Sequence, residues 1–255
     1  MGRLKVIDRG DFERIIVVGD IHGDYESFKR IRELFNPDRD LIVFLGDYAD
    51  RGDMGIEVIE GIYELIEMYG DRIIALKGNH EDYRNGEPYF QPCTLIWEAD
   101  LKRGGWINYY NSFLTKFFAK LFLAAIYRNI LFVHGGISSK IGSIKDLENP
   151  SYEVEEDVLW SDPYEEEGEI PNYRGAGILF GPDISRRICK ILNVDYIVRS
   201  HEPRKAFRGP FIEHEGRIVT ISSTRIYGGI PFIIAIPSVE TPRNGYELKN
   251  YVIKL

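Results

Sequence analysis

Five short apolar runs, rich in β-branched residues, each end abruptly in a polar cluster, and this pattern limits the possible folds more than any other feature of the sequence. The runs span residues 14–18, 41–45, 73–76, 130–133 and 196–198. Continuous apolar runs of this length are typical of strands that are buried on both faces of a sheet. Open α/β sheets bind ligands beyond the carboxyl ends of their strands, so these polar clusters predict a functional site along one rim of the sheet.

Helical patterns separate the first three runs. Residues 25–35 place Phe28 and Ile31 on one helical face, and residues 55–69 do the same with Ile59 and Ile62. The alternation of strand and helix predicts a parallel sheet with right-handed crossovers.

The last third of the chain has a different pattern, typical of antiparallel strands. Residues 211–221 read as a hairpin with its turn at Glu215-Gly216, and residues 232–236 and 246–253 read as further strands. We therefore predict an α/β (mixed α+β) fold, a β-sandwich flanked by helices.

Composition favours one domain over residues 1–255, because no Pro/Gly/Ser-rich linker and no repeat interrupts the chain. The net charge of -8 argues against a nucleic-acid partner. The longest apolar stretch, residues 113–126, contains Lys116 and Lys120 and is too short to span a membrane. The N-terminus shows no apolar signal core, and the distant Cys93 and Cys189 predict reduced thiols, so we expect a cytoplasmic protein with no membrane partner.

The polar clusters combine carboxylate, amide and imidazole groups. They contain the following residues in chain order: Asp20 and His22, Asp47 and Asp50, Asn79 and His80, His134, and His201. Of the five histidines, only His214 lies away from a predicted strand end. Any single cluster is more often a turn or a hydrogen-bonded structural group, but the recurrence at five strand ends favours a shared site. Mixed ligands of this kind suit Mn, Fe or Zn better than Ca.

At this level of detail the sequence resembles the phosphoprotein phosphatase family of the calcineurin-like metallophosphoesterases. The similarity extends over residues 15–221. The motifs that carry it are Gly19-Asp20-Ile21-His22-Gly23, Gly46-Asp47-Tyr48-Ala49-Asp50-Arg51-Gly52, Gly78-Asn79-His80-Glu81, Val133-His134-Gly135-Gly136, Leu159-Trp160-Ser161-Asp162-Pro163 and Arg199-Ser200-His201-Glu202.

The resemblance implies two divalent metal ions and a role for each site residue. It implies that Asp20 and His22 hold the first metal and that Asp47 bridges both. The ligands that complete the second site would be Asn79, His134 and His201. Arg51 and Arg174 would bind the phosphoryl oxygens, although Arg174 could also be an ordinary surface arginine. His80 would protonate the leaving alkoxide, oriented by Asp50.

The implied activity is that of a serine/threonine protein phosphatase: hydrolysis of phosphomonoesters by in-line attack of a hydroxide shared by the two metals. Manganese is the expected metal, with Fe or Zn as alternatives. A phosphoprotein or phosphopeptide would be the substrate. Hydrolysis of dinucleoside polyphosphates or other small phosphoesters on the same core is the alternative, and a non-catalytic binding module is a third.

Two segments depart from the family pattern or match nothing in it. Where the family often has Ala-Pro-Asn-Tyr-Cys, this chain has Ser222-Ser223-Thr224-Arg225-Ile226-Tyr227-Gly228, so Tyr227 is either a shifted equivalent or a packed aromatic residue. Residues 81–104 match no family pattern beyond Glu81. Acidic residues around Trp160, including Glu155 and Asp157, are usually a solvated face, with selection of basic phosphopeptides as the alternative.

Overall fold

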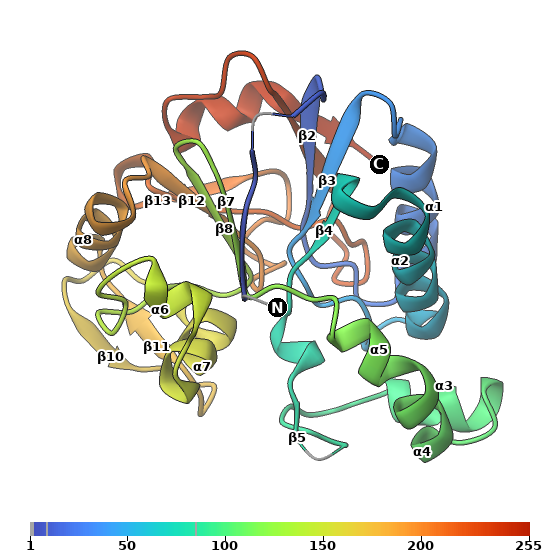
Figure 1. Ribbon diagram of the computed structural model, residues 1–255. Coiled ribbons are helices and arrows are strands. Elements are labelled where there is room, and N and C mark those ends of the chain that lie inside the picture. The colour runs from blue at the N-terminus through green and yellow to red at the C-terminus, as the bar shows by residue number, and fades with distance from the viewer. Residues whose placement is uncertain (1–2, 9, 85) are drawn as a thin grey trace.

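The computed structural model describes residues 3–8, 10–84 and 86–255. Two large sheets stand face to face, with helices on their outer sides (Figure 1). The five-stranded sheet runs in the order β16 (Val252–Lys254), β15 (Phe232–Pro237), β2 (Arg14–Val18), β3 (Asp40–Phe44), β4 (Ile73–Ala75). The six-stranded sheet runs β1 (Leu4–Val6), β7 (Ala124–Tyr127), β8 (Ile130–Val133), β12 (Tyr196–Arg199), β14 (Ile218–Thr220), β13 (Phe211–Glu213).

Alternation along the central strands explains why the apolar runs are continuous. In β2, Ile15 and Val17 pack between the two sheets, whereas Ile16 and Val18 pack against the outer helices. The same division holds in β8, where Phe132 lies between the sheets and Leu131 lies on the outer face. Because both faces are covered, these strands need apolar side chains at every position.

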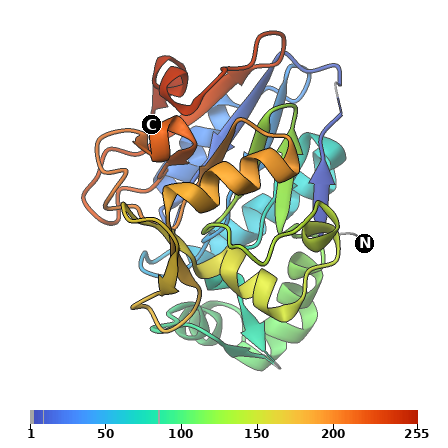
Figure 2. The same cartoon turned by 90° about the vertical axis from the view of Figure 1, so that its left-hand side faces the viewer.

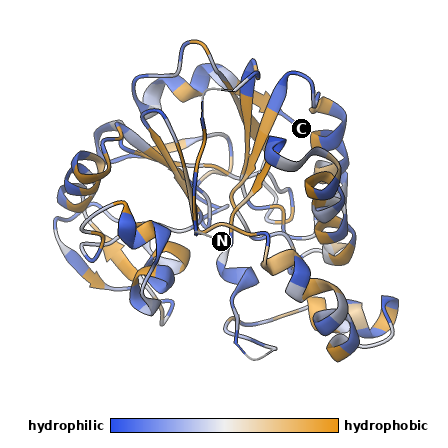
Figure 3. Ribbon diagram, viewed as in Figure 1, coloured by the Kyte–Doolittle hydropathy of each residue, from blue (hydrophilic) through white to orange (hydrophobic). Residues whose placement is uncertain are grey.

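Helices cover the five-stranded sheet on one side and the six-stranded sheet on the other, with their apolar stripes turned inward (Figures 1 and 3). The first side carries α1 (Tyr25–Leu34) and α2 (Gly55–Tyr69), and α8 (Pro182–Leu192) crosses the face of the other sheet in Figure 2. Phe28 and Ile31 of α1 and Ile59 and Ile62 of α2 are buried, as predicted. Asp24 caps α1 by accepting a hydrogen bond from the backbone N–H of Ser27 at 3.1 Å.

The shorter helices α3 to α7 lie at the lower end of the molecule in Figure 1. The helices are α3 (Leu95–Lys102), α4 (Trp106–Tyr109), a π-helical turn (Tyr110–Leu114), α5 (Thr115–Phe118), α6 (Lys145–Glu148) and α7 (Tyr152–Trp160). The minor strands are β5 (Tyr83–Arg84) with β6 (Glu87–Pro88), and β9 (Asp162–Pro163), β10 (Glu169–Pro171) and β11 (Ile178–Phe180). The 3-10 turns are Gly70–Arg72, Asn79–Glu81, His214–Gly216 and Gly245–Tyr251.

The predicted topology is confirmed for most of the sandwich. β2, β3 and β4 pair in parallel, β13 and β14 form an antiparallel hairpin, and β15 pairs antiparallel with β2. The prediction of a strand over residues 246–253 is wrong, because Gly245–Tyr251 is a 3-10 helix and only Val252–Lys254 forms a strand. The side chain of Asn244 accepts from the backbone N–H of Tyr246 and of Glu247, which starts a helical turn, and Leu248 is then buried between the sheets.

Candidate metal centre

The strand ends of both sheets deliver the predicted residues to one place. Asp20 follows β2, Asp47 follows β3 and Asn79 follows β4, while His134 and His201 follow β8 and β12 of the other sheet. A bridge between Asp20 and Ser222 joins the two groups of loops. All of these side chains are buried, and so is His22. Residues more than 180 positions apart in the chain therefore meet, as Asp20 and His201 do through a hydrogen bond from the backbone N–H of His201 to Asp20 Oδ1 at 3.1 Å.

The backbone at this site adopts uncommon conformations. His22, Asp47 and His201 have φ angles of 50°, 56° and 70°, in the left-handed region that residues other than glycine rarely occupy. Such strain persists where surrounding contacts hold it, typically at functional sites. Gly78 makes the tight packing possible, because a Cβ there would lie 2.3 Å from Asp47 Oδ1.

Hydrogen bonds set the tautomers of two imidazoles so that their Nε2 atoms carry free lone pairs. His22 Nδ1 lies 3.0 Å from the carbonyl oxygen of Ala49, and His134 Nδ1 lies 2.9 Å from that of Leu45. A carbonyl only accepts, so each Nδ1 carries the proton and each Nε2 faces the cluster unprotonated. Asp47 lies between them, with Oδ2 3.4 Å from His22 Nε2 and Oδ1 3.3 Å from His134 Nε2.

The cluster holds more acceptor atoms than the protein has protons to satisfy. Asn79 Oδ1 lies 3.0 Å from His134 Nε2, so two acceptors face each other. Turning the amide would aim its two hydrogens at four acceptors: both oxygens of Asp47, His134 Nε2 and His201 Nδ1. Asp20 Oδ2 is buried with no hydrogen-bond partner among the described residues. Buried acceptors crowded in this way fit cations placed between them.

The candidate ligands fall into two groups that share Asp47. One comprises Asp47, His134 and His201, and the other comprises His22, Asp47 and His80, with the ligand atoms of each within 4.8 Å of one another. A carboxylate common to both groups is the arrangement expected of a bridging ligand. His80 stands in the second group where the sequence suggested Asp20, whose Oδ2 lies 4.0 Å from His22 Nε2.

Burial sets the protonation of these groups. It lowers the pKa of His22 to about 4, and it lowers the pKa of His134 and of His201 well below the usual value, so these imidazoles are neutral at pH 7. Burial also raises the pKa of Asp47 well above its usual range, with the Asp20 carboxylate adding to the effect. Neutral imidazoles beside the Asp47 carboxylate, whose charged form burial disfavours, are suited to a cation, which stabilises that charged form.

His80 and Asp50 form a pair beside the cluster. His80 Nδ1 lies 2.8 Å from Asp50 Oδ2, and Asp50 Oδ1 accepts from the backbone N–H groups of Thr94 at 2.6 Å and Leu95 at 3.0 Å. Burial alone would raise the pKa of Asp50, but the bond from His80 and these N–H groups lower it. Asp50 is therefore a fixed anion that holds His80 Nδ1–H and leaves Nε2 directed toward the pocket.

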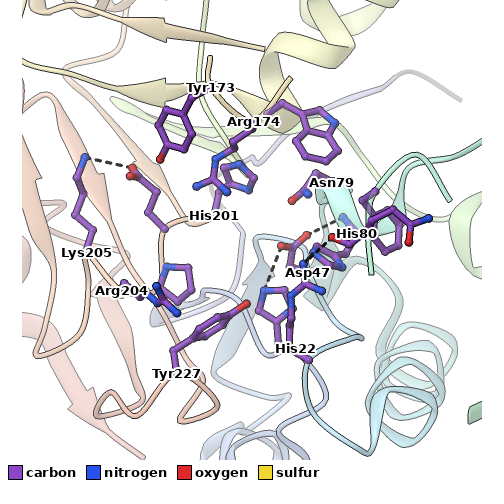
Figure 4. Close-up of a pocket in the computed structure, with 16 residues that line it drawn as sticks. His22, Asp47, Asn79, His80, Tyr173, Arg174, His201, Arg204, Lys205 and Tyr227 are labelled. Atoms are coloured by element: carbon purple, nitrogen blue, oxygen red, sulfur yellow. Dashed lines mark hydrogen bonds and ion pairs between the residues drawn. The ribbon is translucent and has the colours of Figure 1, made fainter. Parts of the chain in front are cut away.

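A cavity of about 530 Å³ opens over this cluster, with Arg51 and Arg174 in its wall. Figure 4 shows Arg174 beside His201. Arg174 Nε donates to Asp162 Oδ2 at 2.7 Å, and Arg51 Nη1 donates to the carbonyl oxygen of Pro92 at 2.9 Å. Arg174 uses only Nε in this contact and leaves its Nη N–H groups for a ligand, whereas Arg51 Nη2 also lies 3.4 Å from the carbonyl oxygen of Gln91 and 3.4 Å from His80 Nε2. Tyr227 also lines the cavity, and its ring centroid lies 5.6 Å from that of His22. Tyr227 is therefore part of the site rather than an aromatic residue packed elsewhere.

Some residues of the sequence motifs that were given no role hold the candidate ligands in place. Glu81 accepts hydrogen bonds from the backbone N–H groups of Asp47, Tyr48 and Gly78 at 2.9 to 3.0 Å and so ties two ligand loops together. Ser200 Oγ donates to Asp20 Oδ1 at 2.5 Å. His214 lies outside the site, as expected, with Nδ1 2.6 Å from Ser185 Oγ.

Two cationic side chains of the cavity were not predicted from the sequence. Arg204 and Lys205 line the cavity next to His201 in the chain. In the sequence they stand out only as a charged pair separated by Pro203 from the last ligand motif, and neighbouring charges in a loop usually face solvent.

A family profile, curated relatives and solved structures all place the chain among the same proteins. The profile of the family described as calcineurin-like phosphoesterase matches residues 13–205. Serine/threonine-protein phosphatase 5 of Homo sapiens is 31% identical over 225 residues, which are 84% of this chain and 44% of that protein. Serine/threonine-protein phosphatase T of Schizosaccharomyces pombe is 29% identical over 231 residues, 86% of this chain and 47% of that protein. The chain thus spans about half the length of these curated relatives.

Among solved structures, a protein serine/threonine phosphatase of Saccharomyces cerevisiae superposes with a TM-score of 0.76 at 25% identity, over 99% of this chain and 82% of that one. Among the described residues, no helix is both long and apolar enough to cross a membrane.

Proposed function

Because the chain belongs to the calcineurin-like phosphoesterase family, we propose that it hydrolyses phosphomonoesters with two divalent metal ions, and that its substrates are phosphoserine and phosphothreonine in proteins. One observation carries the proposal: buried acceptor atoms gather on both sides of Asp47, and His80, held by Asp50, faces the same cavity as two arginines. The relatives that match the chain are named serine/threonine phosphatases, which supports the substrate class.

Asp20, His22 and Asp47 would hold one metal ion, and Asp47, Asn79, His134 and His201 the other. When bound, the two cations supply a nucleophile from water at neutral pH and offset charge on the phosphoryl group. The mixture of imidazole, carboxylate and amide ligands supports manganese as the metal, with iron or zinc as alternatives. We further propose that residues 1–255 act as one catalytic unit, since both sheets contribute ligands.

His80 would donate the proton that the leaving oxygen of serine requires. Its Nδ1–H is held by Asp50, so Nε2 is the atom that faces the substrate, and the Asp50 carboxylate stabilises the protonated imidazole. Cys93 and Cys189 are free thiols, which is consistent with a cytoplasmic location as part of the same proposal.

Arg174 is expected to bind substrate phosphate. Replacing it by alanine should raise KM for a phosphoserine peptide and weaken inhibition by inorganic phosphate, roughly tenfold or more for each, because charge-assisted hydrogen bonds are worth about 1.5–3 kcal/mol. Steady-state kinetics measure both. Arg187→Ala, at an exposed position on α8, is the matched control and should change neither. Unchanged KM and phosphate inhibition in Arg174→Ala would make Arg174 a structural partner of Asp162 only.

Substrate choice tests the proposed function itself. The protein should release phosphate from a phosphoserine peptide at a kcat/KM well above that for a dinucleoside polyphosphate. Asp47→Asn, expressed and purified in the same way as the wild type, serves as the control for contaminating phosphatases. A clear preference for the dinucleoside polyphosphate would assign the site to nucleotide hydrolysis, and turnover of neither substrate would remove the proposed activity.

A further inference from the structure

A second cavity adjoins the one over the metal centre. It measures about 780 Å³, and cations supply half of its lining: Lys205, Arg208, Lys249 and Lys254. Lys205 lines both cavities, so the two adjoin at this side chain. Figure 4 shows Arg204 and Lys205 on the side of the first cavity that lies away from His80.

Three of the four cations that line the second cavity have no compensating carboxylate among the residues that the structure describes. Arg208, Lys249 and Lys254 are exposed, and in the described part of the chain none of them forms an ion pair or a side-chain hydrogen bond. No described Asp or Glu lines this cavity. Lys205 differs, because it contacts Glu202 at 3.3 Å and Glu213 at 2.9 Å. In a chain of net charge -8, three uncompensated cations on one surface produce a local positive potential against the overall balance.

Arg204 extends this potential into the catalytic cavity. Its guanidinium carbon lies 6.0 Å from the ring centroid of Tyr227, and no carboxylate among the described residues pairs with it. The other pocket arginines are held, Arg174 by Asp162 and Arg51 by the carbonyl of Pro92. Arg204 is therefore a free cation in the wall of the site proposed for the phosphoryl group.

Two of the acidic residues near Trp160, Glu155 and Asp157, are already paired with lysines. Glu155 contacts Lys77 at 2.9 Å and Asp157 contacts Lys140 at 2.7 Å, and neither lines the catalytic cavity. Glu202 does line it, but Arg199 at 2.5 Å and Lys205 already pair with it. The selection of basic phosphopeptides, left open by the sequence, thus lacks a free acidic partner at these positions.

We propose that Arg204, Arg208, Lys249 and Lys254, together the basic surface, bind an acidic segment of the substrate next to its phosphorylated residue. The inference rests on the proposed function and adds the substrate class: phosphoproteins with Asp or Glu flanking the phosphoserine. A polypeptide fits better than a nucleic acid, because Phe211, 41% exposed, lies among the cations and offers apolar contact, and because four cations are few for a phosphate backbone.

Two phosphoserine peptides of equal length test the inference, one with Asp and Glu flanking the phosphoserine and one with Asn and Gln in their place. Wild type should show a KM roughly tenfold lower for the acidic peptide, since each exposed ion pair contributes a few-fold and several act together. The difference should shrink as salt is raised from about 0.05 to 0.5 M, because salt screens exposed charges.

The triple variant Arg208→Ala, Lys249→Ala, Lys254→Ala should lose most of this preference. Its KM for the acidic peptide should rise toward that of the neutral peptide, with the neutral peptide and p-nitrophenyl phosphate unaffected. A control triple, Lys116→Ala, Lys145→Ala, Lys190→Ala, removes the same charge from exposed positions outside both cavities and should keep the preference.

Each other outcome counts against the inference in a distinct way. Equal KM values for the two peptides in wild type would overturn the basic surface while leaving phosphatase activity intact. Equal loss of preference in both triple variants would assign the effect to net charge. Stronger competition by a single-stranded oligonucleotide than by an unphosphorylated acidic peptide would make the surface a nucleic-acid site. Hydrolysis of neither peptide would instead refute the proposed function.

Discussion

Replacing His80 by asparagine is expected to lower kcat on a phosphoserine peptide by roughly 10²–10⁴-fold, the contribution typical of a positioned general acid. The loss on p-nitrophenyl phosphate should be distinctly smaller, because p-nitrophenolate leaves without a proton and a serine alkoxide does not. Both metals should remain bound, since the structure gives His80 a hydrogen-bond partner in Asp50 at 2.8 Å. Steady-state kinetics on the two substrates, with elemental analysis of each preparation, measure all three quantities.

Two further variants make this comparison specific. Asp50→Asn should show the same pattern more mildly, because it removes only the group that orients and stabilises the protonated imidazole. His214→Asn changes a buried histidine outside the site and should leave the ratio of the two kcat values unchanged. Equal losses on both substrates, or a missing metal in His80→Asn, would make His80 a ligand, a role that its proximity to His22 and Asp47 also allows.

Asp47→Asn is expected to remove at least one metal ion and nearly all activity. Groups in the outer shell of a metal site typically contribute 10- to 100-fold, so the loss of a bridging carboxylate should exceed that and reach the order of 10³-fold. Asparagine keeps the shape of the side chain but brings no negative charge to share between two cations. Elemental analysis and phosphate release measure the two effects.

Asp40→Asn provides the matched control for Asp47. Asp40 is equally buried and begins β3, the strand that Asp47 follows, but it pairs with Arg14 at 2.7 Å at the other end of the sheet. Its loss should lower stability and leave the metal content unchanged. Two tightly held metals with normal turnover in Asp47→Asn would refute the bridging assignment.

The strand ends could be predicted from sequence because both faces of the central strands are covered. That burial makes each strand a continuous apolar run, and the first polar residue after the run marks the rim of the sheet. Asp20, Asp47 and His134 were found in this way, before any geometry. Their side chains do lie together, with His134 4.0 Å from Asp20 and 3.3 Å from Asp47, although residues far apart in the chain supply them.

What the sequence did not reveal depends on contacts between separate elements. Asp162 orients Arg174 at 2.7 Å and pairs with Arg199 at 2.8 Å, and no local spacing predicts such a link. The run after Asn244 has strand-like residues, but one side-chain cap turns it into a 3-10 helix. Arg204 lies in a turn, where charged residues usually face solvent, and only the folded structure shows that it lines the cavity.

The most direct test of the account is to titrate metal back into the wild-type chain after a chelator has removed it, while following phosphate release from a phosphoserine peptide. The stripped protein should be inactive, and activity should return with Mn²⁺ and reach a plateau at about two ions per chain, as a shared bridging site requires. Ca²⁺ should not restore it, because imidazole ligands disfavour that cation. Full turnover by the stripped protein, or a plateau at one ion per chain, would contradict the two-metal centre.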